Sequence, residues 1–315
     1  MPSISIIIAT SDRLPALRDT LLSLGMVLVP DDFSVELVLV ENGSRQGAEE
    51  LLRLLPPDRF SVQYLFVPLA GKSRALNVAI PKAKGDLLMF TDDDVRFPSN
   101  WIADMCRPLI GGEGAVVVGG ARIAPELERP WMTRYHRGFL ASTEYLSDTD
   151  PSEFAGLNFA CLRSVFVKVQ GFDSELGGGG LGNAEDCLLA RQLKQAGLKF
   201  VSRTNVLVEH HPDESRLLYG NWKRTAAANG RSQAYLMHHW YHQNMRWVRL
   251  RLLYFRLKLW FRSLFRSSSP LEAEGIPAWE LSYRTDIAKF EHYQVERLRP
   301  RNYACQGLGK LKHDH

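Results

Sequence analysis

Short apolar runs alternate with helical segments through the first hundred residues, and this alternation constrains the fold more than any other feature. The runs are rich in β-branched residues, as strands buried on both faces are. Strands that alternate with helices predict an α/β fold with a mixed, mainly parallel sheet flanked by helices. We expect strands over residues 3–10, 35–40, 62–67 and 86–91, and helices over residues 15–24, 46–55 and 71–83.

Beyond residue 100 the pattern is less regular, and it changes character near residue 235. Strands are expected over residues 115–123 and 200–209, and a helix over residues 185–196. After residue 235, aromatic, apolar and basic residues recur with helical spacing. We therefore predict an α/β domain over residues 1–235 and a mostly helical appendage over residues 236–315.

Three loops of this pattern should lie together at one edge of the sheet. Residues 10–13, 41–44 and 92–94 each follow an expected strand directly. In sheets of this kind, ligands bind beyond the carboxyl ends of the strands. The alternation therefore places a binding site at this edge before any motif is considered.

Three consecutive aspartates, Asp92, Asp93 and Asp94, follow the fourth expected strand. In an extended segment residues two apart face the same way, so Asp92 and Asp94 can converge on one cation. Carboxylate oxygens suit Mg²⁺ or Mn²⁺, which often join protein carboxylates to phosphates. A solvated acidic turn before the next helix is the alternative interpretation.

A second acidic pair, Glu185 and Asp186, opens a helix after a glycine-rich run. A carboxylate there is stabilised by the helix N-terminus, and acids at a helix start are also common without any function. The glycines of residues 176–182 predict a mobile loop that could close over a ligand. Their G-x-G-x-x-G spacing is not a dinucleotide fingerprint, because that motif should follow a first strand.

Arg74 and two histidines complete the candidate set. Arg74 lies in the first turn of the helix that begins near Gly71, where it could neutralise a diphosphate. His210 and His211 end a strand that should return to the same edge, where an imidazole could bind a metal or a phosphate. An exposed first-turn arginine and a structural histidine are the alternatives.

The net charge of +4 is concentrated in one segment. Residues 246–266 contain seven arginines and lysines and no acid, so the rest of the chain carries 4 − 7 = −3. A local patch of this kind argues against a nucleic-acid surface. Because the apolar and basic residues fall on different faces, we expect this helix to lie in a membrane interface. Packing on the rest of the chain or in a homodimer is the alternative.

Cysteine usage and the chain's N-terminus bear on location. The four cysteines form no C-x-x-C pair, which predicts buried thiols in a reducing compartment. Residues 1–10 lack the features of a signal peptide, and no apolar run is long enough to span a bilayer. We therefore expect a cytoplasmic location, with residues 246–266 as an attachment to the inner face of the membrane.

Taken in order, these motifs resemble the family 2 inverting glycosyltransferases, which have the GT-A fold. The resemblance covers about residues 3–235 and implies a GT-A-like, Rossmann-like catalytic domain. It implies transfer from a nucleotide sugar, with a UDP-sugar as the default, to a hydroxyl of a glycan or lipid-linked acceptor in polysaccharide biosynthesis. The matching stretches are SISIIIATSDR, VELVLVENGS, GKSRALNVAI, KGDLLMFTDDDV, GLNFACLRSVFVKVQGFD, NAEDCLLARQLKQAGLKF and VEHHPDESR with the later NGRS.

The resemblance also implies a role for each matching position. Asp186 would be the general base, with Glu185 as its neighbour or substitute, and Glu41 stands where the family usually has an aspartate that contacts the nucleoside. A divalent cation, Mn²⁺ or Mg²⁺, would be bound by Asp94, Asp92, His210 and His211. The implied contacts with the nucleotide sugar are Thr10, Asp12, Arg13, Glu41, Arg74, Asp92, Asp93 and Asn158.

The implied mechanism is a single displacement that inverts the anomeric carbon without a covalent glycosyl-enzyme, in contrast to a retaining hydrolase. Two other functions compete with it. A nucleotidyltransferase should show a glycine-rich basic loop after the first strand, and residues 11–15 are not one. A non-catalytic nucleotide-sugar or carbohydrate-binding subunit need not keep Asp92, Asp94, Arg74 and Asp186 together.

Overall fold

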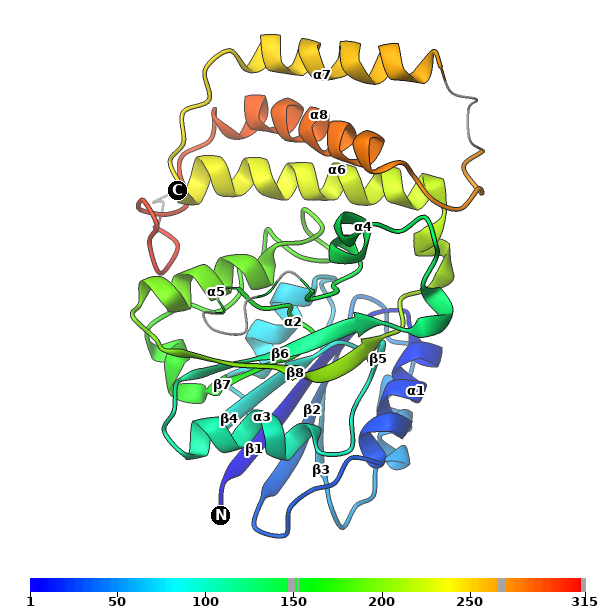
Figure 1. Cartoon of the computed structure of the whole chain (residues 1–315). Helices are drawn as coiled ribbons and strands as arrows, with labels where there is room; N and C mark the ends of the chain where they lie inside the picture. Colours follow the sequence, from blue (N-terminus) through cyan, green and yellow to red (C-terminus); the bar gives the residue numbers. More distant parts are fainter. Residues whose placement is uncertain (145, 147–150, 152, 266–269, 313–315) are drawn as a thin grey trace.

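An eight-stranded mixed sheet forms the centre of the protein within the part of the chain that the structure describes (Figure 1). The structure is a computed structural model and describes all residues except 145, 147–150, 152, 266–269 and 313–315. The strand order is β3-β2-β1-β4-β7-β6-β8-β5. The strands are β1 (Ser3–Thr10), β2 (Ser34–Asn42), β3 (Ser61–Val67), β4 (Leu87–Thr91), β5 (Val95–Arg96), β6 (Val116–Ile123), β7 (Phe159–Leu162) and β8 (Phe200–His210).

Strands β1 to β4 form the parallel half of the sheet, as the alternating pattern predicts. Strand β7 is antiparallel to both β4 and β6, whereas β6 and β8 are parallel. Short β5 runs antiparallel to β8 and pairs Val95 with His210. This last pairing matters for function, because it brings the end of β8 beside the aspartates that precede β5.

Helices cover both faces of the sheet, and for this reason successive residues Ile6 to Ala9 of β1 are all apolar. Ile6 and Ile8 face a core formed with α1 (Leu14–Gly25) and α3 (Trp101–Ile110). Ile7 faces the opposite core, which is formed with α2 (Lys72–Ala79) and α5 (Glu185–Gln195). Because successive side chains of a strand point to opposite faces, the single run Ser3–Thr10 serves both cores.

One expected α-helix has a different form. The segment predicted over residues 46–55 contains a short 3-10 helix, η1 (Ala48–Leu54), with Gly47 at its N-terminus in a left-handed conformation, φ 93°. Leu55, Pro56 and Pro57 follow, and the two prolines prevent the helix from continuing. Helix α2 likewise ends at Ala79, shortly before Pro81, rather than at residue 83.

Three long helices form a separate layer above one face of the sheet domain (Figure 1). They are α6 (Tyr219–Tyr235), α7 (Val248–Ser263) and α8 (Ala278–Glu296). Helix α6 lies nearest the sheet and α7 is outermost. Among the helices within the described ranges, none combines the length and apolarity needed to cross a membrane.

The helical layer begins earlier than the boundary expected at residue 235. Trp222 of α6 and Leu281 of α8 share a core with Ile123 of the sheet. At Gly230 a Cβ atom would lie 2.4 Å from the carbonyl oxygen of Thr285, so only glycine allows α6 and α8 to approach this closely. Short helix α4 (Arg134–Phe139) packs at the same junction.

The four free thiols differ in exposure. Cys106 and Cys161 are buried, and burial raises the pKa of both thiols. Cys187 is half-buried and Cys305 is exposed. The prediction of four buried thiols is therefore wrong for Cys305, which lies in the chain after α8.

Candidate active site

The carboxyl ends of β1, β2 and β4 meet at one edge of the sheet, as expected. Strands β1 and β4 are direct neighbours, with Ile8 paired to Thr91. The amide of Asn42, at the end of β2, donates to the carbonyl of Thr10 over 2.7 Å and accepts from the backbone N–H of Gly71 over 2.8 Å. These two bonds fix the start of α2 against the end of β1.

Arg13 holds two of the three aspartates. Its Nη1 atom lies 2.9 Å from Oδ1 of Asp93, and its Nη2 atom contacts Oδ2 of Asp94. The hydroxyl of Thr10 donates to Asp93 Oδ2 over 2.7 Å. Burial raises the pKa of Asp93 to about 6 although Arg13 opposes this, and Asp94 adds to the rise. Asp93 is thus part of the hydrogen-bonded frame of the site.

Asp94 faces His210 from the neighbouring strand. The Nε2 atom of His210 lies 3.2 Å from Asp94 Oδ2, and its Nδ1 atom lies 2.7 Å from the carbonyl oxygen of Leu140. Because a carbonyl only accepts, Nδ1 carries a proton and fixes the ring with Nε2 toward Asp94. Burial alone would raise the pKa of Asp94, but His210 and Arg13 hold it well below its usual range.

His211 does not join this group. Its Nδ1 atom lies 3.1 Å from Oε1 of Glu126, and its Nε2 atom lies 3.6 Å from Oε2 of Glu209. Adjacent residues of an extended segment point to opposite sides, so only one histidine of the pair can face Asp94. His211 therefore lies beside Glu126 and Glu209 rather than Asp94, and its expected role as a metal ligand stays a prediction.

The residues around Asp94 suit a divalent cation. Its Oδ1 atom is buried and has no hydrogen-bond partner among the described residues. Metal-binding histidines commonly donate their second ring N–H to a carbonyl, as His210 does to Leu140. In the described ranges no three His, Cys, Asp or Glu side chains are grouped closely enough to hold a metal by themselves. Mg²⁺ and Mn²⁺ sites often use few protein ligands and complete their shell with substrate phosphates.

Lys72 connects the aspartate triplet to the second acidic pair. Its Nζ atom lies 2.5 Å from Oδ1 of Asp92 and 3.6 Å from Oε1 of Glu185. Burial raises the pKa of Glu185 to about 7, and Asp186 adds to the rise while Lys72 opposes it. The carboxylates of β4 and α5 therefore share one charged centre. The sequence pattern drew attention to Arg74 and missed Lys72, two residues before it.

Asp186 is half-buried and oriented by the backbone. Its Oδ2 atom accepts from the N–H of Gly156 over 2.8 Å, and its Oδ1 atom accepts from the N–H of Cys187 over 2.8 Å. Asp186 is thus held as a fixed acceptor beside Glu185.

The glycine-rich segment lies on the first turn of α2. The N–H of Lys72 donates to the carbonyl of Gly178 over 2.9 Å, and Ser73 Oγ donates to the carbonyl of Leu176 over 3.0 Å. A Cβ atom on Gly179 would lie 2.7 Å from the Cα atom of Gly71. The glycines allow this close backbone contact, and the predicted closure of the loop over a ligand stays a prediction.

Arg74 and Asp12 leave polar groups available at this edge. The Nη1 atom of Arg74 donates to the carbonyl of Ala70 over 2.9 Å, and the described residues offer its guanidinium no carboxylate partner. Asp12 is exposed, in a left-handed conformation with φ 53°. Both placements are compatible with ligand contact, and neither is tested by a bound molecule.

Two other candidates are occupied by internal bonds. Glu41 accepts from the N–H of Gln46 over 2.7 Å and from the hydroxyl of Tyr64 over 2.5 Å. Asn158 is 0% exposed. Its amide donates to the carbonyls of Gly120 and Val206, and it accepts from the indole of Trp101. These bonds argue against a direct contact of Asn158 with a donor sugar. Its expected role stays a prediction.

Comparison with known proteins gives a family match. The family model described as Glycosyl transferase family 2 matches residues 5–169, which is 165 of the 315 residues. The succinoglycan biosynthesis protein ExoM of Rhizobium meliloti (strain 1021) is 29% identical over 111 residues, or 35% of this chain and 36% of that protein. The chain thus matches about a third of the length of this relative.

A solved glycosyltransferase structure shares this fold at low sequence identity. The mannosyltransferase PcManGT from Pyrobaculum calidifontis, in complex with GDP-Man and Mn²⁺, superposes with a TM-score of 0.55. It is 18% identical, and the match covers 93% of this chain and 69% of that chain. Residues 1–349 of S. aureus TarS, in complex with UDP-GlcNAc, give a TM-score of 0.48 at 15% identity, covering 73% and 66%. The second likeness is too weak to carry an argument.

Proposed function

The chain belongs to glycosyl transferase family 2 and has the GT-A fold, and from this premise we propose that it transfers a sugar from a nucleotide sugar to an acceptor hydroxyl. One observation carries the proposal. Asp92 follows β4 and Glu185 opens α5, yet Lys72 contacts both carboxylates. The triplet that would face a donor and the pair that would act on an acceptor therefore lie in one site.

The donor would bind across the carboxyl ends of the parallel strands. Arg74 would contact the diphosphate, since its guanidinium has no carboxylate partner among the described residues. Thr10, Asp12 and Arg13 would lie beside the nucleotide, with Glu41 behind them. A UDP-sugar is our default. PcManGT was solved with GDP-Man, so a guanine nucleotide is the direct alternative.

A divalent cation, Mn²⁺ or Mg²⁺, would be held by Asp94 and His210, with Asp92 nearby. The unpartnered Oδ1 atom of Asp94 supports this assignment. A bound cation supplies positive charge that offsets the charge developing on the leaving nucleoside diphosphate. Asp94 would be ionised and able to bind the cation, because His210 and Arg13 keep its pKa low.

Asp186 would remove the proton from the acceptor hydroxyl as that oxygen attacks the anomeric carbon. The backbone N–H groups of Gly156 and Cys187 hold its carboxylate in one orientation. A single displacement would then invert the anomeric carbon. Glu185 is the competing base, because its pKa of about 7 is close to the value that suits proton transfer at neutral pH.

The acceptor would be a glycan or a lipid-linked glycan, and the protein would work at a membrane surface. The name of ExoM supports polysaccharide biosynthesis as the setting. Residues 246–265 supply the membrane contact in this proposal; Arg266, the seventh basic residue of the segment, lies outside the described residues. A homodimer that covers the same helix is the alternative that a measurement of oligomeric state would identify.

A ligand screen tests the transferase proposal. Thermal melting is measured with UDP, GDP and dTDP, each with Mn²⁺ or with a chelator, and turnover is then measured with sugars of the nucleotide that stabilises the protein. We expect one nucleotide to stabilise the protein only when the cation is present. Stabilisation without turnover of any matching sugar would instead support a non-catalytic binding subunit.

A further inference from the structure

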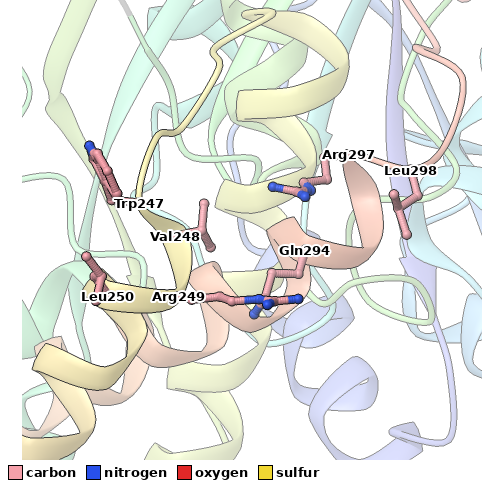
Figure 2. Close-up of a pocket in the computed structure, with 7 residues that line it drawn as sticks. All are labelled: Trp247, Val248, Arg249, Leu250, Gln294, Arg297 and Leu298. Carbon is pink, nitrogen blue, oxygen red and sulfur yellow. The ribbon is translucent and has the colours of Figure 1, made fainter.

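A groove lies between the N-terminal end of α7 and the C-terminal end of α8 with the residues that follow it (Figure 2). Its volume is about 520 Å³. The residues that line it are Trp247, Val248, Arg249, Leu250, Gln294, Arg297 and Leu298. The groove is far along the chain from the strand ends described above and shares no residue with that site.

Two arginines among the residues that line the groove make it positively charged. Figure 2 shows the side chains of Arg249 and Arg297 reaching into the space between the two helices, with Gln294 beside them. None of the described residues that line it is acidic, and among the described residues neither arginine forms an ion pair. Two such guanidinium groups favour an anion, and guanidinium matches phosphate in geometry.

The rim of the groove is apolar and exposed. Trp247 is 73% exposed and Leu298 is 79% exposed. Trp247 also has a left-handed backbone conformation, φ 60°, which is costly for a bulky residue. Because Trp247 is mostly exposed to solvent, its packing on the described residues offsets little of this backbone strain. An indole beside a cationic groove is typical of the boundary between water and lipid.

Leu250 joins this groove to a longer apolar face. Helix α7 buries only Val248 and Leu252, and at about 100° per residue its opposite side points away from the protein. Large exposed side chains occupy that outward side: Leu250, Leu253, Tyr254, Leu257, Trp260, Phe261 and Leu264. The basic side chains of Arg249, Arg251, Arg256, Lys258 and Arg262 lie along its two flanks.

We propose that this groove binds the phosphate group of an anionic phospholipid while the outward face of α7 lies in the bilayer interface. The arrangement matches the two needs of such a helix, apolar area toward acyl chains and cations at headgroup depth. This proposal rests on the membrane contact of the proposed function and adds to it a headgroup phosphate and the two arginines that would bind it. It orients α7 parallel to the surface, with the sheet domain on the aqueous side.

The test uses the full chain and two binding measurements. Sedimentation is measured with vesicles of phosphatidylcholine alone and of phosphatidylcholine mixed with phosphatidylglycerol. Calorimetry is measured with monomeric short-chain phosphatidylglycerol and with inorganic phosphate. We expect binding to the anionic vesicles and to the short-chain lipid. The double variant Arg249→Gln, Arg297→Gln should lose about 30-fold in vesicle partitioning, as two surface cations contribute roughly that much.

A second double variant, Arg246→Gln with Arg251→Gln, is the matched control, because both arginines are exposed. It removes two positive charges, as the first variant does, but leaves the residues that line the groove intact, so it should keep binding of the short-chain lipid. Equal losses by both variants would mean diffuse attraction and would overturn the headgroup site. Inorganic phosphate that binds as tightly as the short-chain lipid would overturn the lipid assignment. Trp247→Phe should reduce quenching by brominated lipid, a readout independent of turnover.

The outcome separates this inference from the transferase proposal. Nucleotide binding with Mn²⁺, measured without vesicles, reports on the strand ends alone. A chain that binds nucleotide but no anionic lipid would remove only the inference drawn here. A chain that binds lipid through Arg249 and Arg297 but no nucleotide would remove only the transferase proposal.

Discussion

The Nζ atom of Lys72 lies 2.5 Å from Oδ1 of Asp92, across the gap between the first turn of α2 and the end of β4. Lys72 thereby neutralises a carboxylate that would also face a divalent cation and a diphosphate. Glu185, 3.6 Å from the same Nζ atom, depends on it as well. The carboxylates are therefore balanced by a protein cation, and a divalent cation that bound Asp92 would have to compete with Lys72.

Replacing Lys72 with methionine should change metal and nucleotide affinity in opposite directions. Without the ammonium group, Asp92 and Glu185 attract Mn²⁺ more strongly, and we expect about tenfold tighter Mn²⁺ binding by calorimetry without nucleotide. Nucleoside diphosphate should bind more weakly, because a nearby positive charge is lost. Lys82→Met, at an exposed position, is the control. Unchanged affinity for Mn²⁺ in Lys72→Met would show that the lysine does not compete for the site.

The elevated pKa of Glu185 predicts a pH dependence of stability. The unfolded value is 4.5 and the folded value is about 7, so between these values the folded protein holds a proton that the unfolded chain releases. The free energy of unfolding must then fall as pH rises through this window, on the order of 2–3 kcal/mol for the metal-free protein. Glu185→Gln should lack this contribution. Urea unfolding at the two ends of the window measures it, and parallel curves for both proteins would contradict the assignment.

Asp94→Asn should abolish the coupling between metal and nucleotide. The amide cannot supply a second anionic oxygen, and His210 and Arg13 lose the charge they face. We expect nucleotide affinity in the presence of Mn²⁺ to drop at least tenfold, to the value measured with a chelator. Asp31→Asn, on an exposed loop, should leave both values unchanged. Full metal-dependent affinity in Asp94→Asn would remove this residue from the metal site.

Asp186→Asn and Glu185→Gln distinguish the two candidate bases. If Asp186 removes the proton, its variant should keep donor affinity and lose between 100-fold and 10,000-fold in kcat, which is about what general base catalysis contributes. Glu185→Gln should then lose far less. Single-turnover rates at saturating donor make the comparison independent of binding. The reverse order of losses would assign the proton transfer to Glu185.

The sequence predicts the sheet well and places the candidate site residues at the ends of its parallel strands, because both follow from local patterns. Each apolar run became a strand close to the expected bounds, and parallel order placed Thr10 beside Asp93. What the pattern cannot supply is the partner of a side chain. Lys72 and Arg74 occupy one helical turn, and only the packing of α2 decides which faces Asp92. Strand alternation shows that His210 and His211 must point apart, but not which one faces Asp94.

Non-local bonds explain the other differences. Asn158 sits in a family-like motif, yet the indole of Trp101, far away in sequence, accounts for one of its hydrogen bonds. Glu41 ends a strand as expected, but its carboxylate also holds the backbone that begins η1 and the hydroxyl of Tyr64. A change in composition predicts a boundary near residue 235, whereas α6 on one side of it packs closely against α8 on the other.

Tyr303 ties the end of the chain to the segment that leads into the acidic pair. Its hydroxyl donates to Asp173 Oδ2 over 2.7 Å, and the hydroxyl of Tyr235 donates to the same oxygen over 2.6 Å. Lys310 completes the cluster, with Nζ 2.6 Å from Asp173 Oδ1. The segment after Asp173 continues to the glycine-rich loop on α2.

Tyr303→Phe should therefore lower the free energy of unfolding by about 1–3 kcal/mol, because it removes one donor from a buried carboxylate while Tyr235 and Lys310 remain. Tyr254→Phe, at an exposed position on α7, should change it by less than about 0.5 kcal/mol. Urea unfolding of both variants gives the comparison. Amide hydrogen exchange in residues 173–182 should rise in Tyr303→Phe alone, since this segment loses one of its bonds to the C-terminal segment. Unchanged exchange there would mean that the cluster stabilises the chain end without positioning the loop.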